Sequence, residues 1–328
     1  VRANIGLDIG SVHAKLAIGL PPDSDLPGAE AFPGGDFIFL GPEKVGGYPR
    51  KAAEKLLSKA AEILPESAAN ITMTGSQSEL TAAVLGARRI NDFEAVCRGV
   101  RSLEPGARSI VEIGGDSSKV IILEVDDSGE YYILDYNRNG DCAAGTGSFI
   151  DQQAARLNYE VGEIGEIVQS ADATANIAGR CSVFAKSDMI HAQQRGYSPA
   201  AICKGLCEAV VRNFIGTILR GKKLVPKVAF VGGLAANCGV VSAMREALGE
   251  KGVEMVVPAR HAFASAAGCA LSDGREVDIG GISAGGIEIS TPDKAERGNS
   301  LDTTRVKKSG REKLTSSIPG GTERFRGY

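Results

Sequence analysis

The two halves of this chain contain the same short pattern of residues. Asp8-Ile9-Gly10 is followed by Lys15, and Glu112-Ile113-Gly114 is followed by Lys119 at the same interval. In both places the flanking residues predict a strand, a tight glycine turn and a second strand. A repeat of this kind constrains the fold strongly, because each copy is expected to form the same unit.

The residues after each hairpin extend the likeness between the halves. Each pair of strands is followed by a third predicted strand and then by a helix. This shared order makes chance the weaker explanation and predicts an α/β protein made of two βββα-type halves. The predicted strands are Ile5–Asp8, Leu16–Ile18 and Phe37–Leu40 in the first half and Ile110–Glu112, Val120–Leu123 and Tyr131–Asp135 in the second, and the helices are Pro49–Ile63 and Gly147–Leu157.

The composition excludes several classes of function. With 328 residues, of which 43% are hydrophobic, the chain has ample material for a core and for about two domains. A net charge of −3 predicts no strong attraction to nucleic acid. No apolar run reaches the ~18 residues of a membrane span, and we expect no signal peptide before the first strand. We therefore expect a cytoplasmic protein without a nucleic-acid or membrane partner.

The hairpin turns contain the residue types that hold phosphate groups. Glycine lets backbone N–H groups approach phosphate oxygens closely, and Ser11 adds a hydroxyl. Asp8 and Glu112, one in each hairpin, are suited to holding Mg²⁺ through water, since Mg²⁺ prefers oxygen ligands and keeps its hydration shell. Two such hairpins facing each other would clamp the phosphates of a nucleoside triphosphate.

A third segment suits the nucleoside. Val228–Val231 predicts a buried strand that ends in Gly232-Gly233 and continues into a helix, and such a turn offers its backbone to a ribose or an adenine.

His13 is expected at an exposed turn rather than as a catalyst, because phosphoryl transfer depends more on positioning than on a base. The predicted ATP-binding residues are Gly10, Ser11, Val12, His13, Lys15, Gly114, Gly115, Asp116, Gly232, Gly233, Leu234 and Asn237.

Two of the seven cysteines stand in unusual surroundings. Cys142 precedes a glycine-rich turn that opens a helix, where a thiolate is stabilised by the helix N-terminus, and Cys181 lies in a second motif. Two thiolates per chain suit a [4Fe–4S] cluster shared across a symmetric dimer, but from the residues alone a pair of inert thiols is equally open. The other cysteines are expected to be buried and reduced: Cys97, Cys203, Cys207, Cys238 and Cys269.

The three nucleotide segments, in this order, resemble those of the sugar kinase, heat-shock 70 and actin superfamily. The cysteine motifs Asp141–Gly147 and Gly179–Asp188 narrow the resemblance to the BadF/BadG/BcrA/BcrD ATPase family, over about residues 3 to 271. Within it, the chain looks like the activators of 2-hydroxyacyl-CoA dehydratases. The resemblance implies a two-lobed actin-like fold of duplicated βββαβα units.

The resemblance also implies an activity. Members are homodimers that hold one [4Fe–4S] cluster between the subunits, and the matching ligands here are Cys142 and Cys181. ATP hydrolysis, with Asp8 and Glu112 in catalytic positions around Mg²⁺, lets the cluster pass one low-potential electron to a dehydratase or a benzoyl-CoA reductase-like partner. A ferredoxin- or flavodoxin-like protein is the implied upstream donor.

Two departures from the family pattern keep other functions open. The family's second hairpin usually reads Asp-Ile-Gly-Gly-Gln-Asp, whereas Glu112 and Asp116 replace its first Asp and its Gln. A regulator that binds ATP without hydrolysing it is one alternative. A small-molecule kinase of the same superfamily is another, with Asp92 at a predicted helix start as base, although helix N-termini favour acidic residues anyway.

The same reasoning divides the chain into three parts. We expect residues 1–98 to form a first ATPase lobe and residues 99–272 a second lobe that contains the cysteine motifs and the adenosine turn. Residues 273–328 are expected to be a flexible tail or linker, because Gly, Ser, Thr, Lys and Arg dominate most of this segment and it lacks apolar periodicity.

Overall fold

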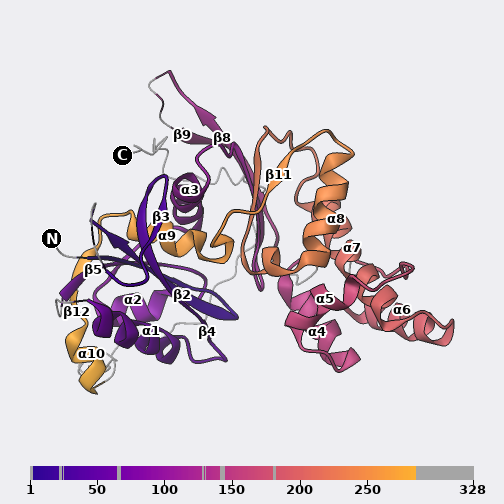
Figure 1. Cartoon of the computed structure of the whole chain (residues 1–328), viewed down its shortest axis with the longest axis horizontal. Helices are drawn as coiled ribbons and strands as arrows, with labels where there is room; N and C mark the ends of the chain where they lie inside the picture. Colours follow the sequence, from indigo (N-terminus) through magenta and orange to yellow (C-terminus); the bar gives the residue numbers. More distant parts are fainter. Residues whose placement is uncertain are drawn as a thin grey trace, which may run out of the picture.

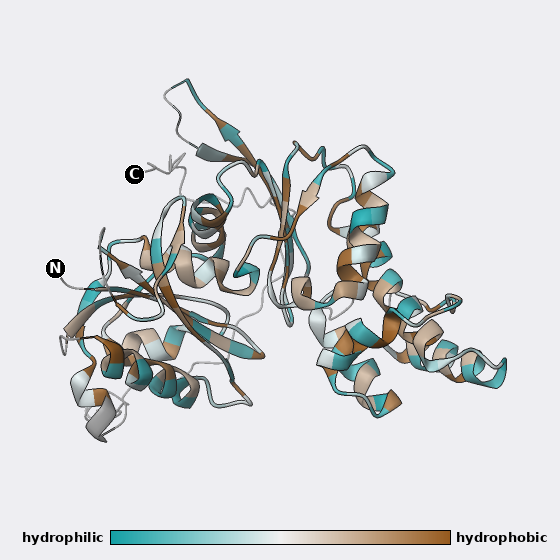
Figure 2. Ribbon diagram, viewed as in Figure 1, coloured by the Kyte–Doolittle hydropathy of each residue, from teal (hydrophilic) through white to brown (hydrophobic). Residues whose placement is uncertain are grey.

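Two β-sheets lie side by side, and helices cover both faces of each (Figure 1). This arrangement is seen in a computed structural model, which describes residues 3–21, 24, 26–64, 68–127, 129, 131–140, 145–179 and 182–285. Hydrophobic residues concentrate in the strands at the centre of each lobe and alternate with polar ones along α1 (Pro49–Ile63) (Figure 2).

The first sheet is mixed, with strand order β12-β5-β1-β2-β4-β3 and β6 paired with β5. Its centre is β1, which runs antiparallel to β2 and parallel to β5. The strands are β1 Asn4–Ile9, β2 His13–Leu20, β3 Glu30–Phe32, β4 Gly35–Lys44, β5 Ala68–Thr74, β6 Arg88–Arg89 and β12 Arg275–Asp278.

The second sheet repeats the central part of the first, with strand order β11-β10-β7-β8-β9. Here β7 runs antiparallel to β8 and parallel to β10, as β1 does to β2 and β5. The strands are β7 Ser109–Ile113, β8 Ser118–Val125, β9 Tyr131–Arg138, β10 Val228–Val231 and β11 Met255–Val256.

The strand register confirms the duplication predicted from the sequence. Asp8 stands directly opposite Lys15 in the β1–β2 hairpin. Glu112 stands directly opposite Lys119 in the β7–β8 hairpin. Directly opposed residues of antiparallel strands point to the same face of a sheet, so each acid faces its lysine across the turn.

Each lobe buries one sheet face against its own helices. In the first lobe α1, α2 (Glu79–Leu85) and α10 (Gly280–Gly285) accompany the sheet, and α1 buries Ala53, Leu56, Leu57 and Ala60 at helical spacing. The second-lobe helices are α4 Gly147–Leu157, α5 Ile164–Val168, α6 Ser182–Gln194, α7 Pro199–Thr217 and α8 Cys238–Gly249. Most of them pack into one large apolar cluster around α7.

Two helices lie between the sheets and join the lobes (Figure 1). Helix α3 (Asp92–Leu103) packs on the second sheet, whereas α9 (Ala264–Ala270) packs on the first. They approach each other so closely that a Cβ atom on Gly268 would lie 1.8 Å from the carbonyl oxygen of Ala95. Only glycine permits this contact, so the backbones of α3 and α9 touch where the two helices meet.

The structure corrects two predictions about the end of the chain and the cysteines. Residues predicted as tail form β12, which pairs with β5, and α10, so the first sheet includes chain beyond residue 273. Cys97, Cys203, Cys207 and Cys269 are buried, but Cys238 is exposed because it begins α8 at the surface. The remainder of the predicted tail, from residue 286, lies outside the described residues.

Candidate functional site

A cleft of about 1050 Å³ separates the lobes. Both hairpins, the turn after β10 and the N-terminal ends of α3 and α4 line it. All but one of the predicted ATP-binding residues lie along this cleft. The exception is Asn237, whose side chain instead accepts a hydrogen bond from the Val240 N–H and caps α8.

The first hairpin brings an acid and a lysine to the cleft. Asp8 and Lys15 form an ion pair with 3.4 Å between Oδ2 and Nζ, and both side chains are 14% exposed. His13, at the start of β2, also lines the cleft, and burial together with Lys15 and Lys44 lowers its pKa. A neutral imidazole at pH 7 adds no charge to the phosphate region.

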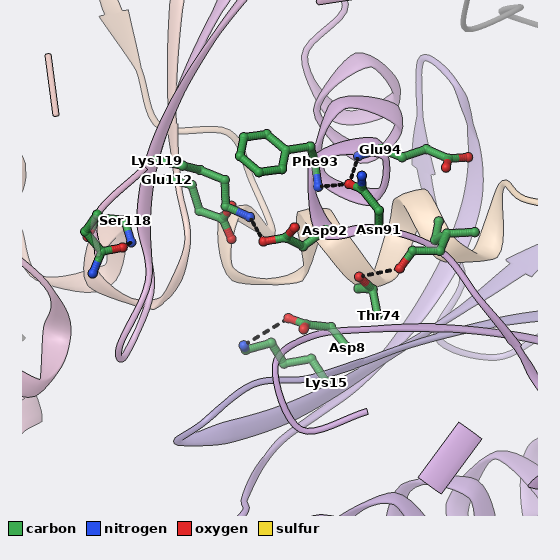
Figure 3. A network of polar contacts seen from close by, with 12 residues as sticks. Asp8, Lys15, Thr74, Asn91, Asp92, Phe93, Glu94, Glu112, Ser118 and Lys119 are labelled. Atoms are coloured by element: carbon green, nitrogen blue, oxygen red, sulfur yellow. Dashed lines mark hydrogen bonds and ion pairs between the residues drawn. The ribbon is translucent and has the colours of Figure 1, made fainter. Parts of the chain in front are cut away.

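The second hairpin has a more tightly held pair. Lys119 is only 3% exposed, and its Nζ lies 2.9 Å from Glu112 Oε2 and 2.7 Å from Asp92 Oδ2 (Figure 3). Burial alone would lower the pKa of Lys119, but these two carboxylates raise it well above its usual value. Lys119 therefore stays charged and fixes both acids.

Asp92 reaches this site from the N-terminus of α3, where the side chain of Asn91 caps the helix. Burial would raise the pKa of Asp92, but Lys119 and Arg138 lower it overall. Asp92 lines the cleft as an ionised carboxylate across from Asp8 (Figure 3). The kinase interpretation placed a base here, but a carboxylate stabilised in this way is a weak base.

The two phosphate hairpins touch across the cleft. A Cβ atom on Gly115 would lie 2.5 Å from Cγ2 of Val12, so a larger residue there would force the Val12 side chain to move. The second turn also receives the start of α4, since the N–H groups of Gly147 and Ser148 donate to the carbonyls of Gly114 and Gly115, each at 2.8 Å. A ligand between the turns would therefore contact both lobes and the end of α4.

Asp116, at the position where the resemblance implies a glutamine, turns toward α4. Its carboxylate accepts a hydrogen bond from the Ser148 hydroxyl. Asp151, one turn further along α4, also lines the cleft, and burial together with the charge of Asp116 raises its pKa. The substitution thus adds negative charge beside the second phosphate turn.

The predicted adenosine turn lines the cleft beside the second hairpin, because β10 pairs with β7. Gly232 and Gly233 follow β10, and the Gly232 carbonyl is 3.0 Å from Nδ1 of His261. Burial lowers the pKa of His261, which favours the neutral ring. His261 and the Gly232 backbone therefore hold each other in place beside the turn.

Sequence reasoning missed several cleft residues. His261 sits in a short 3₁₀ turn and Arg89 on a two-residue strand, so neither has a recognisable local pattern. Arg138 is the last residue of the half-exposed edge strand β9, and Asn139 follows it. The predicted third strand of the second half was the only indication in the sequence that Arg138 and Asn139 reach the cleft. Their position depends on the register between strands rather than on neighbouring residues in the sequence.

The oxygen donors of the cleft suit a magnesium ion. Asp8 and Glu112 stand on opposite hairpins, and each side chain keeps 14% of its surface exposed despite its lysine. Carboxylate oxygens that reach the cleft are appropriate for holding Mg²⁺ through water beside phosphates. In the described part of the chain, no three His, Cys, Asp or Glu side chains gather as a direct metal site. The predicted cluster ligands Cys142 and Cys181 lie outside the residues that the structure describes.

Within the described ranges, none of the helices is both long and apolar enough to cross a membrane.

Two lobes built from the same hairpin unit, with an acid and a lysine facing a cleft from each side, define an actin-like ATPase fold. Sequence comparison assigns the family: the BadF/BadG/BcrA/BcrD ATPase family matches residues 5–272, and the chain belongs to it. The resemblance inferred from the cysteine and hairpin motifs is thereby confirmed.

Named relatives are similar over most of their length. The chain is 30% identical over 268 residues to the 2-hydroxyisocaproyl-CoA dehydratase activator of Clostridioides difficile, which covers 81% of this chain and 93% of that protein. It is 33% identical over 241 residues to the activator of lactoyl-CoA dehydratase of Anaerotignum propionicum, covering 73% and 86%. The activator of the 2-hydroxyisocaproyl-CoA dehydratase from Clostridium difficile, solved with bound ADPNP, matches with a TM-score of 0.67 and 26% identity over 86% of this chain and 96% of that one.

Proposed function

We propose that this protein is an ATP-dependent one-electron donor that activates a 2-hydroxyacyl-CoA dehydratase or a benzoyl-CoA reductase-like enzyme. Two copies would share one [4Fe–4S] cluster through Cys142 and Cys181 of each, with a ferredoxin- or flavodoxin-like protein as the upstream donor. The family, the relatives named as dehydratase activators and the cleft between two phosphate hairpins support this proposal.

One observation carries the link between nucleotide and cysteine. The segment around Cys142 lies outside the described residues, but the residues on both of its sides bond to the second phosphate hairpin. On one side, Asn139 Oδ1 accepts from the Ser118 N–H at 2.8 Å. On the other side, Gly145 accepts from the Ser118 hydroxyl at 2.6 Å, and Gly147 donates to Gly114. A phosphate that moves this hairpin would therefore move both ends of the segment.

The residues divide the proposed work between them. The cluster would supply a low-potential electron, because thiolate-held iron–sulfur centres reach strongly negative potentials. Asp8 and Glu112 would hold Mg²⁺ through water, and the backbone of Gly10, Gly114 and Gly115 would receive the phosphates. Gly232 and Gly233 would receive the adenosine.

The kinase alternative remains weaker. It gains from Asp92, which lies in the cleft where a base for an acceptor hydroxyl would be needed. It loses because Lys119 binds that carboxylate at 2.7 Å and lowers its pKa. A kinase would also have no use for the two cysteine motifs.

Iron analysis of anaerobically purified protein tests the proposed cluster. We expect about four iron atoms per dimer, by the four-thiolate rule, and a brown protein. Cys142→Ala and Cys181→Ala should each remove the iron, whereas the matched controls Cys203→Ala and Cys238→Ala should keep it. Full iron content in the Cys142→Ala/Cys181→Ala double variant would refute the ligand assignment.

A second experiment tests whether nucleotide binding and the proposed cluster affect each other. Adding ATP and Mg²⁺ to the reduced protein should change the visible spectrum or speed chelation of its iron, since coupled sites affect each other reciprocally. Sugars and acyl-CoA should leave the ATPase rate unchanged. A cluster that does not respond to ATP, or stoichiometric phosphorylation of an added acceptor, would contradict the proposed activity.

A further inference from the structure

Arg138 lines the cleft, but neither the family motifs nor the hairpin repeat predict a role for it. It is the last residue of β9 and stands directly opposite Lys119 of β8, which in turn stands opposite Glu112 of β7. Directly opposed residues share a face, so the three side chains form one row across three strands. Arg138 thus extends the acid–lysine pair of the second hairpin by one cation, and it lines the same cleft.

The backbone at Arg138 is anchored to the phosphate turn. The next residue, Asn139, makes hydrogen bonds to the second hairpin through three of its groups. Its N–H donates to the Ser118 carbonyl at 2.9 Å, its Oδ1 accepts from the Ser118 N–H at 2.8 Å, and its Nδ2 donates to the Asp116 carbonyl at 3.0 Å. These three hydrogen bonds fix the backbone at Arg138 relative to the turn. Binding a ligand there would therefore cost less conformational entropy.

The other cations of the cleft are already engaged. Lys15 pairs with Asp8, and Lys119 pairs with two carboxylates. Arg89 donates from Nε to the Ser78 hydroxyl at 3.0 Å. Arg138 is an exposed residue whose charge helps to lower the pKa of Asp92, but its guanidinium makes no hydrogen bond or ion pair with any residue that the structure describes.

We propose that Arg138 binds the terminal phosphate of ATP and stabilises the charge that develops on it during hydrolysis. This inference rests on ATP hydrolysis in the cleft, as in the proposed function. In the reaction, a water oxygen bonds to the γ-phosphorus while the bond from that phosphorus to the β–γ bridging oxygen breaks. The bridging electron pair stays with ADP, and the water proton leaves with inorganic phosphate or solvent. A planar guanidinium presents a fork of donors to two phosphate oxygens at once.

Nucleotide affinity and turnover in one variant test this role. In Arg138→Gln, the Kd of a non-hydrolysable ATP analogue with Mg²⁺ should rise about tenfold or more, the amount expected for a charge-assisted hydrogen bond. The Kd of ADP should stay within about twofold of the wild-type value, because ADP lacks the contacted phosphate. The kcat for ATP should fall by about 100-fold or more. Arg245→Gln, an exposed arginine on α8, is the matched control and should change none of these values.

The results separate this inference from the proposed function. An equal loss of affinity for ADP and the analogue would show that Arg138 acts on the cleft in general and would overturn the assignment to the terminal phosphate. A kcat in Arg138→Gln within about twofold of the wild-type value, with Asp8→Asn inactive, would overturn the inference while leaving ATP hydrolysis intact. No ATPase activity in the wild-type protein would instead remove the proposed function itself.

Discussion

Replacing Lys119 by methionine removes the cation that two carboxylates share at the base of the cleft. Met retains most of the side-chain volume but leaves Glu112 and Asp92 without the ammonium that both carboxylates contact. With separations of 2.9 Å and 2.7 Å, each pair is worth about 6 kcal/mol of attraction at an effective dielectric constant near 20. The cost of burying the ammonium offsets much of this attraction, and solvent screens Asp92, whose side chain is 37% exposed.

The net loss is set by the charges left behind. Removing one partner of a buried ion pair costs about 3–5 kcal/mol of unfolding free energy. We expect Lys119→Met to lose about this amount, with a fall in Tm of about 2–4 °C per kcal/mol. The native pKa of Lys119 is raised above the value of about 10.4 that an unfolded lysine has. Its charge therefore contributes fully to the free energy of unfolding below about pH 10.4, and this contribution is lost only as the pH rises through the higher native pKa. The loss should therefore not change between pH 6 and pH 9.

Chemical denaturation provides the assay, and the chain offers a matched control. Lys55 and Glu43 are also close, at 2.6 Å, but Lys55 is 58% exposed, so Lys55→Met should cost less than about 1 kcal/mol. Adding Glu112→Gln and Asp92→Asn to Lys119→Met should recover part of the lost stability. If Lys119→Met costs no more than Lys55→Met, the buried pair contributes no more than a surface pair and the reasoning is refuted.

Two further predictions concern the lobe junction and the metal site. Gly268→Ala should destabilise the protein by about 3 kcal/mol, because its Cβ would lie 1.8 Å from a backbone oxygen, whereas Gly216→Ala, with open space in α7, should be neutral or stabilising in the same denaturation assay. Asp8→Asn should lower kcat for ATP more than it weakens analogue binding, because the metal matters most as charge develops on the phosphates, and normal turnover would contradict the metal assignment.

The sequence predicted the elements whose signal is local. The helices Pro49–Ile63 and Gly147–Leu157 have the predicted bounds, because apolar spacing marks the first and a glycine-rich start marks the second. Both hairpins were predicted because an acid, a glycine turn and a lysine recur together. Such features depend on residues within a single turn or strand pair.

What the sequence did not predict depends on contacts between distant segments. Asp92 was identified at a helix start, but its bond to Lys119 arises only because α3 packs on the second sheet. Arg138 reaches the cleft through the β8–β9 register. Residues Arg275–Asp278 were assigned to a tail because this short, largely exposed segment has no apolar alternation. It forms a strand because it pairs with β5, which its own residues do not indicate.

The duplicated acid–lysine pairs differ in geometry, and this difference predicts the effect of Glu112→Asp. Asp8 and Lys15 are 3.4 Å apart, whereas the longer side chain of Glu112 reaches Lys119 at 2.9 Å. Shortening it draws the carboxylate back and makes the second hairpin resemble the first. Since the first hairpin presents an aspartate to the same cleft, we expect hydrolysis to be retained or faster, with a stability loss of about 1 kcal/mol from the weaker contact. A variant without ATPase activity would show that the lobe geometry has adapted to the longer carboxylate and that the two acids are not equivalent.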